Sequence, residues 1–417
     1  MHTRDILVRA SRVVEAMAVR REMGMSELLR RWKPVLLLVL VVGGLLSCGW
    51  RWVEVHRYKS AMAEIEDDVD NGRHATAARK LTAVLAGQPD SDEANYLLGT
   101  CEMARGKTQA ADAAWARVRR DSRFAPSAIL GSMQVQMELG RLSVAEKIII
   151  DALDDPLVDG SSLPILLAPV YCQQGRLEET LRLIETRWEA LYRAGEGATE
   201  PAINLTRAYI DLRKSPIPIE VARAVLDEAA RRDPDDDRVW LGKANLAIRT
   251  GSYDDAARWL DDCLRRRPDD ESVWRARLDW AVTTNRIAEA EEAVKHLPAD
   301  QSSPAQVYKL AAWMAKNGGD EQSERHDLEL LIDTDPADFD AMDRLIELAV
   351  KHAQPERAKE LRRLRSEIET LENRYLKLFE RNQPLRDAAE MAQLAERIGR
   401  RFEAKAFRTV ADAVIGL

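Results

Sequence analysis

Residues 237–270 read DRVWLGKANLAIRTGSYDDAARWLDDCLRRRPDD, and this stretch carries the clearest structural signal in the chain. Trp240 and Ala244 in its first half, and Ala256, Leu260 and Cys263 in its second half, lie at the three- and four-residue spacings of amphipathic helices. The stretch therefore predicts two consecutive helices, each with one apolar face that another element must cover.

The residues between and after these helices are typical helix terminators. Gly251 separates the two halves and can adopt the left-handed conformation that ends a helix. Pro268 breaks the second helix, and the Asp that follows at 270 offers a side-chain cap for the next one.

A period of 34 residues extends this helix pair along most of the chain. The motif Gly-x4-Ala occurs at Gly72/Ala77, Gly106/Ala111, Gly140/Ala145 and Gly251/Ala256. Trp240 and Trp274 are also 34 residues apart. A helix pair repeated at this period predicts a solenoid, in which each unit covers the apolar face of its neighbour.

This pattern resembles the tetratricopeptide-repeat (TPR) family, whose consensus places Trp, Leu-Gly, Tyr, Gly, Ala, an aromatic residue, Ala and Pro at these offsets. Leu98-Gly99, Gly106, Ala111 and Trp115 match it in another unit. The resemblance covers residues 58–372, with a degenerate unit at Gly399/Ala404. It implies an all-α fold, a right-handed superhelix of about nine helix pairs.

The repeats are irregular between Gly175 and Gly251. The 76 residues between these glycines exceed two periods by eight, and the excess falls at residues 192–199 and 214–219. Ser-Pro-Ile-Pro at 215–218 breaks a helix. We interpret the region as either a bend in the superhelix or a subdomain border, with N-terminal units at 58–198 and central and C-terminal units at 199–354.

Residues 355–417 follow a different pattern. A helix without a breaker runs from Pro355 to about Arg381, and its apolar residues follow a heptad. These residues are Leu361, Leu364, Ile368, Leu371, Tyr375 and Leu378. The seam either packs against two closing helices, near 384–398 and 401–415, or forms a homodimer contact.

The N-terminal region predicts a membrane anchor. Residues 35–49 read VLLLVLVVGGLLSCG without a charge, and Trp32, Trp50 and Trp52 flank the run as interfacial aromatic residues do. Although the run is shorter than the ~20 residues that span a bilayer, the flanking residues extend it. We expect one transmembrane helix at 34–54.

Basic residues are more frequent before this run than after it, which predicts a cytoplasmic segment at 1–33 and an extracytoplasmic body. We therefore expect a single-pass protein of the bacterial inner membrane. Leu45-Leu46-Ser47-Cys48 also resembles a lipoprotein box, so lipidation at Cys48 is one alternative to an uncleaved anchor. Plain secretion and a buried hydrophobic helix are the others.

The charge distribution argues against nucleic acid as a partner. Residues 1–59 carry eleven Lys and Arg against five Asp and Glu, but residues 60–417 carry 51 against 65. An acidic body repels phosphate backbones.

The sequence contains no catalytic or metal-binding motif. The six His residues are scattered without ligand spacing, the four Cys are isolated, and no phosphate-binding loop or nucleophile elbow occurs. We expect no enzyme activity, no metal and no cofactor.

The family resemblance also implies a binding groove, because TPR proteins line their inner face with fixed positions of the first helix of each unit. Those positions here are Arg207, Asn245, Arg249, Arg275, Lys309, Trp313 and Lys316. A basic groove with one tryptophan suits an acidic or carboxylate-ended peptide, while the alternative is that these are ordinary solvated residues.

These observations predict a membrane-tethered, protein-binding scaffold that assembles or positions a cell-envelope complex. One alternative is a structural envelope protein that self-associates through its C-terminal helix. Others are a lipoprotein form of the same scaffold and an adaptor that delivers a substrate to an enzyme.

Overall fold

The computed structural model of the protein describes residues 56–155, 164–215, 217–298 and 302–415. Within these ranges the regular elements are helices, and no β-strand is present. The prediction of an all-α fold built from helix pairs is confirmed.

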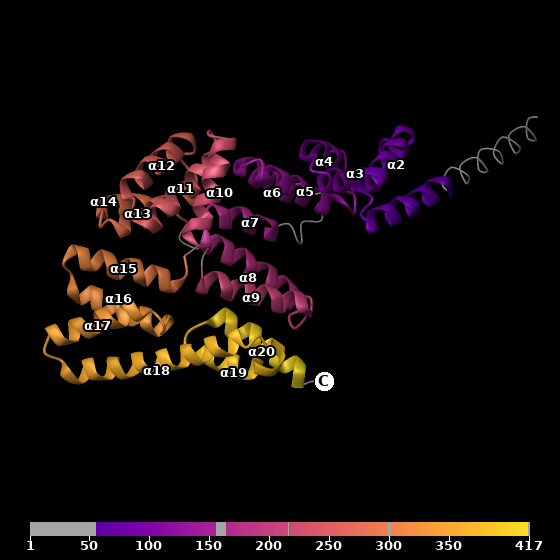
Figure 1. The fold of residues 1–417 in the computed structure, drawn as a ribbon. Coiled ribbons are helices and arrows are strands. Elements are labelled where there is room, and N and C mark those ends of the chain that lie inside the picture. Colours follow the sequence, from indigo (N-terminus) through magenta and orange to yellow (C-terminus); the bar gives the residue numbers. More distant parts are fainter. Residues whose placement is uncertain (1–55, 156–163, 216, 299–301, 416–417) are drawn as a thin grey trace, which may run out of the picture. The chain divides into compact units, whose positions relative to one another are not determined.

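The chain divides into two compact units, of which the first ends at Lys107 and the second begins at Thr108. The described part of the first unit contains the helical residues 56–70, α2 (His74–Gly87) and α3 (Asp92–Ala104) (Figure 1). Met62, Ile65 and Leu81 form its core and are at most 4% exposed. Since each helix offers only one apolar stripe, the three helices must pack together to bury it.

The second unit contains the remaining helices (Figure 1). They are α4 (Thr108–Trp115), α5 (Ala125–Glu138), α6 (Leu142–Leu153), η2 (Pro164–Leu166), α7 (Leu167–Gln173), α8 (Leu177–Arg193), α9 (Glu200–Lys214), α10 (Ile219–Arg232), α11 (Asp237–Thr250), α12 (Tyr253–Arg266), α13 (Glu271–Thr283), α14 (Ile287–Lys295), α15 (Pro304–Gly318), α16 (Glu321–Thr334), α17 (Phe339–Lys351), α18 (Pro355–Glu380), α19 (Pro384–Arg397) and α20 (Arg401–Ile415).

The Gly-x4-Ala motif has the same structural role wherever both of its helices belong to one unit. Its glycines end the first helix of a pair with positive φ, for example 75° at Gly140 and 77° at Gly251. Its alanines are fully buried, as Ala145 and Ala256 show with 0% exposure. A small residue is needed there because the two helices of the pair approach each other closely.

The second signature, Pro followed six residues later by Trp, also repeats in the structure. The indole Nε1 of Trp240 donates to the carbonyl of Pro234 at 2.9 Å, and that of Trp274 donates to Pro268 at 2.7 Å. Each indole therefore fixes the start of its own helix to the turn before it.

The series of pairs changes at the irregular region. Helix α8 ends at Arg193 and α9 ends at Lys214, so both predicted breaks are present. Helix α10 packs against α7, α11 packs against α6, and α9 packs against α20. The two helices that follow the pair α8–α9 therefore pack on the helices before it, α6 and α7, and not on α9. Helix α20, from the end of the chain, covers α9 instead.

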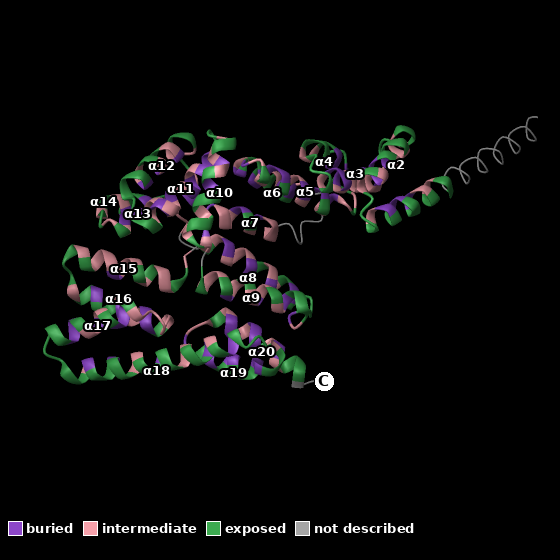
Figure 2. Ribbon diagram, viewed as in Figure 1, coloured by how far each residue is buried: buried purple, intermediate pink, exposed green. Residues whose placement is uncertain are grey.

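The heptad seam of α18 is used inside the chain. Leu361, Ile368, Tyr375 and Leu378 are at most 5% exposed and belong to one core with residues of α16, α17, α19 and α20. Figure 2 shows buried positions alternating with exposed ones along α18. A dimer through this seam would require α18 to leave that core.

The predicted transmembrane segment 34–54, the basic segment 1–33 and Cys48 lie outside the described residues. Among the helices that the structure describes, none is both long and apolar enough to cross a membrane.

Candidate partner-binding surface

Two of the predicted groove residues meet at the turn between α7 and α8. Asn245 on α11 donates from Nδ2 to the main-chain carbonyl of Gln174 at 2.8 Å. Arg275 on α13 lies 3.8 Å from a carboxylate oxygen of Glu178, in the first turn of α8. The inner face of α11 and α13 therefore contacts the chain itself at these positions.

A buried group of charges lies beneath this contact. Glu146 on α6 accepts a hydrogen bond from Arg176 Nη1 at 3.0 Å and forms an ion pair with Arg238, whose Nε lies 2.7 Å away. All three side chains are at most 6% exposed. Arg238 also reaches Asp270 at 2.7 Å, and Arg176 pairs with Glu179 at 2.7 Å. Each buried charge has a partner of opposite sign, which offsets the cost of removing it from water.

The pKa shifts follow from this pairing. Burial opposes ionisation of Glu179 and Asp270, but the adjacent arginines outweigh it, so the pKa of each carboxyl is lowered. Burial also opposes the charge on Arg238, yet Glu146 and Asp270 raise its pKa. These groups are ionised at neutral pH.

Asp279 lies on α13 near the same turn. The protein packed around Asp279, and then the charge of Glu178, raise the pKa of its carboxyl, and the solvent contact that this exposed side chain keeps opposes the rise.

The other predicted groove residues are distributed along the second unit. Arg207 lies over the ring of Phe379, with 5.5 Å between its guanidinium carbon and the ring centre. Arg249 donates to the carbonyl of Ile217 at 2.9 Å, and Lys309 pairs with Asp338 at 2.8 Å.

Trp313 and Lys316 lie one turn apart on α15. Trp313 is partly buried and packs against the core of α11–α14, whereas Lys316 is exposed in the last turn of the helix. The structure thus joins Asn245 and Arg275 at one turn and gives the other predicted residues separate surroundings.

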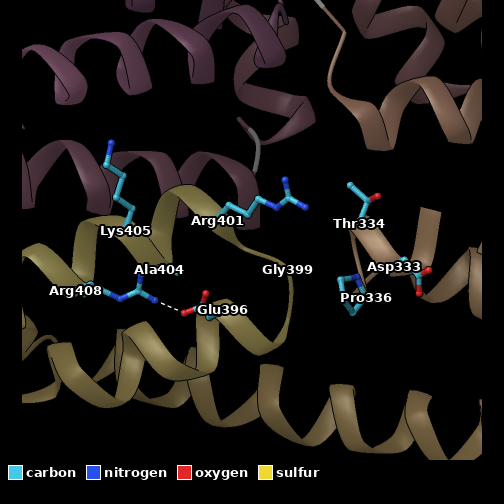
Figure 3. A pocket seen from close by; sticks show the side chains of 9 residues that line it. All are labelled: Asp333, Thr334, Pro336, Glu396, Gly399, Arg401, Ala404, Lys405 and Arg408. Atoms are coloured by element: carbon cyan, nitrogen blue, oxygen red, sulfur yellow. Dashed lines mark hydrogen bonds and ion pairs between the residues drawn. The ribbon is translucent and has the colours of Figure 1, made fainter. Parts of the chain in front are cut away.

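A small hollow lies between the end of α16 and α20 (Figure 3). Its volume is about 220 Å³, and Arg401, Lys405 and Arg408 line it from α20. Lys405 pairs with Glu189 at 2.5 Å and Arg408 pairs with Glu396. Since two of its three cations have partners in the chain, the hollow has little charge left for a ligand.

A second buried ionic contact fixes α20 to α9. Glu403 is 1% exposed and receives Arg213 Nε at 2.8 Å and the hydroxyl of Tyr375 at 2.5 Å. Burial, and then the negative charge of Glu403, raise the pKa of Tyr375, which stays a neutral donor.

Sequence reasoning missed both ionic groups. Glu146 and Arg238 directly follow Ala145 and Asp237, two positions that the repeat pattern assigns. Their place in the repeat could therefore have predicted that they are buried. Their partners lie up to about 90 residues away, which the pattern does not encode.

The fold and these contacts define a helix-pair repeat protein, and comparison with known families identifies the type. Tetratricopeptide-repeat family models match residues 219–278 and residues 62–129. The chain therefore contains tetratricopeptide repeats in these two segments. Because these repeats bind other proteins, it is a protein-interaction scaffold.

Three solved structures illustrate the similarity of the chain to known proteins. A tetratricopeptide repeat protein from Parabacteroides merdae ATCC 43184 is 18% identical and aligns with 61% of this chain and 97% of its own, with a TM-score of 0.27. PilW, a widely conserved type IV pilus biogenesis factor, is 17% identical over 54% of this chain and 99% of its own, with a TM-score of 0.27.

The third is the APC/C hetero-tetramer Cut9–Hcn1, which is 13% identical over 84% of each chain with a TM-score of 0.29. Among curated protein sequences, no significant match to the chain was found.

Proposed function

We propose that this protein is a membrane-tethered scaffold that assembles or positions a cell-envelope complex. The observation that carries the proposal is the uncharged run at 35–49, which precedes the first described helical residue, His56, by only a few positions. A tether so close to the repeats holds them at the bilayer surface and raises their effective concentration near membrane partners.

The orientation follows from Arg30, Arg31 and Lys33, which precede the run and favour the cytoplasmic side. The repeats then lie outside the cytoplasm, and we propose the bacterial inner membrane as the location. The sequence contains no catalytic motif, which favours a binding role over a chemical one.

Replacing Val42 with Arg tests the tether. A charge at the middle of the run costs about 2.5–3.5 kcal/mol of insertion, so Val42→Arg should leave the membrane fraction after a carbonate wash while wild type and Val42→Ala stay. Equal retention of Val42→Arg would refute a spanning anchor. Protease added to spheroplasts should degrade the repeats of the wild type, because the proposal places them outside the cytoplasm. Repeats that resist the protease would refute this orientation.

Maleimide labelling of Cys48 distinguishes the lipoprotein alternative from an uncleaved anchor, because the other thiols react slowly. Cys101 and Cys263 are buried, and burial raises the pKa of the thiols of Cys101, Cys172 and Cys263, the last to about 12. A brief maleimide reaction at pH 7 in mild detergent should therefore label Cys48 alone if it is unmodified. No labelling beyond that of Cys48→Ala would indicate lipidation.

The scaffold role itself is tested by proximity labelling from the C-terminus in the native host. The tethered protein should label a reproducible set of envelope proteins that Val42→Arg, expressed at the same level, does not label. An identical set from both variants would contradict the proposal, because the tether would then make no difference to partner choice.

A further inference from the structure

The inner face of α11 and α13 already holds a segment of acidic character. Asn245 binds the main-chain carbonyl of Gln174 at 2.8 Å, Ser272 donates to Glu179 at 2.9 Å, and Arg275 lies 3.8 Å from Glu178. An amide that binds a main-chain carbonyl, together with donors that face successive carboxylates, is how a groove recognises an acidic peptide.

The contacts become weaker toward solvent. The Glu179 carboxylate receives Arg176 and Ser272 and its side chain is 14% exposed. The Glu178 side chain is 52% exposed, and its ion pair with Arg275 is long at 3.8 Å. The Arg275 side chain is 14% exposed, so this pair is open to solvent on the Glu178 side alone. Because the pair is also long, it contributes little, and Glu178 is the one member of the segment that another carboxylate can replace.

We propose that the first turn of α8 is a built-in acidic ligand of the α11–α13 groove, and that a partner carrying an acidic segment competes with Glu178 for Arg275. This inference rests on the proposed scaffold function and names the chemistry of one partner.

The test is binding of a fluorescein-labelled hexaglutamate peptide to the full chain in detergent, measured by anisotropy at low salt. Glu178→Gln removes the carboxylate that competes with the peptide, so this variant should bind the peptide about two- to five-fold more tightly than wild type. Glu220→Gln is the matched control, because Glu220 is an exposed carboxylate, 81% accessible, that pairs with Arg223 on α10. It should bind as wild type does.

The gain must depend on the groove. Adding Arg275→Gln to Glu178→Gln should remove it, with circular dichroism showing unchanged helix content. Equal binding by Glu178→Gln and wild type, no detectable binding by either, or a gain that survives Arg275→Gln would each overturn the inference. None of these results bears on membrane retention or proximity labelling, so the proposed function stands or falls separately.

Discussion

Replacing Arg238 with Met removes the charge at the centre of the buried ionic group while keeping a side chain of similar length. Arg238 is 6% exposed and bridges Glu146 and Asp270, each at 2.7 Å. Removing one partner of a buried pair costs roughly 3–5 kcal/mol. Glu146 keeps its bond to Arg176, so we expect the lower end, about 3 kcal/mol.

Hydrogen exchange followed by mass spectrometry measures this cost where it acts. About 3 kcal/mol corresponds to roughly 100-fold faster exchange, since each 1.4 kcal/mol is about tenfold. The amides of α6 and α11 should exchange that much faster in Arg238→Met, and those of α2 and α3 in the first unit should not change.

The matched control is Arg223→Met, because Arg223 is 48% exposed and its pair with Glu220 lies on the surface. Loss of an exposed pair costs at most about 1 kcal/mol, or about five-fold in exchange. Exchange in α6 and α11 that stays within about five-fold of wild type for Arg238→Met would refute the reasoning that this group holds the two helices together.

Further predictions concern the turns, the C-terminal contact and pH. Gly140→Ala should destabilise the fold more than Gly251→Ala in urea unfolding: both glycines have positive φ, but an added methyl at 140 lies 2.7 Å from the backbone of Ala229 and at 251 meets nothing. Glu403→Gln should lower the free energy of unfolding by about 2 kcal/mol, because Arg213 loses its charged acceptor; an unchanged urea midpoint would contradict this. The pKa of Glu179 is lowered from its ordinary value of 4.5, so its stabilisation is complete above that pH and disappears as the pH falls through the lowered value. The stability advantage of wild type over Glu179→Gln should therefore shrink between about pH 5 and about pH 3, and a constant advantage would exclude the carboxylate as its source.

The sequence predicts the helix pairs because their determinants are local. Gly140 and Ala145 mark a turn and a close crossing within one pair, and both roles depend on residues five positions apart. The same holds for the long helix at 355 and the two closing helices, whose bounds agree with the structure within a few residues.

The partners of a helix face are not local, and here the sequence was insufficient. The offsets place Asn245 and Arg275 on the inner face of their helices, but they do not reveal that Gln174 and Glu178 lie opposite. That outcome depends on α11 packing against α6, about 90 residues earlier, which the 34-residue period does not predict. Whether the other groove residues bind a partner stays a prediction.

The last helices of the chain cover an apolar face of α9 that the following helix pair leaves open. In a continuous solenoid the next pair would cover α9, but α10 and α11 pack on α7 and α6 instead. The apolar side of α9, including Ile210 at 0% exposure, is covered by the core of α18–α20. Phe402 and Ala406 on α20 complete the cover over Trp188. An apolar face would accept many helices, whereas buried Glu403 requires a compensating positive charge, which Arg213 supplies, so the ionic contact favours the register in which α20 closes the unit.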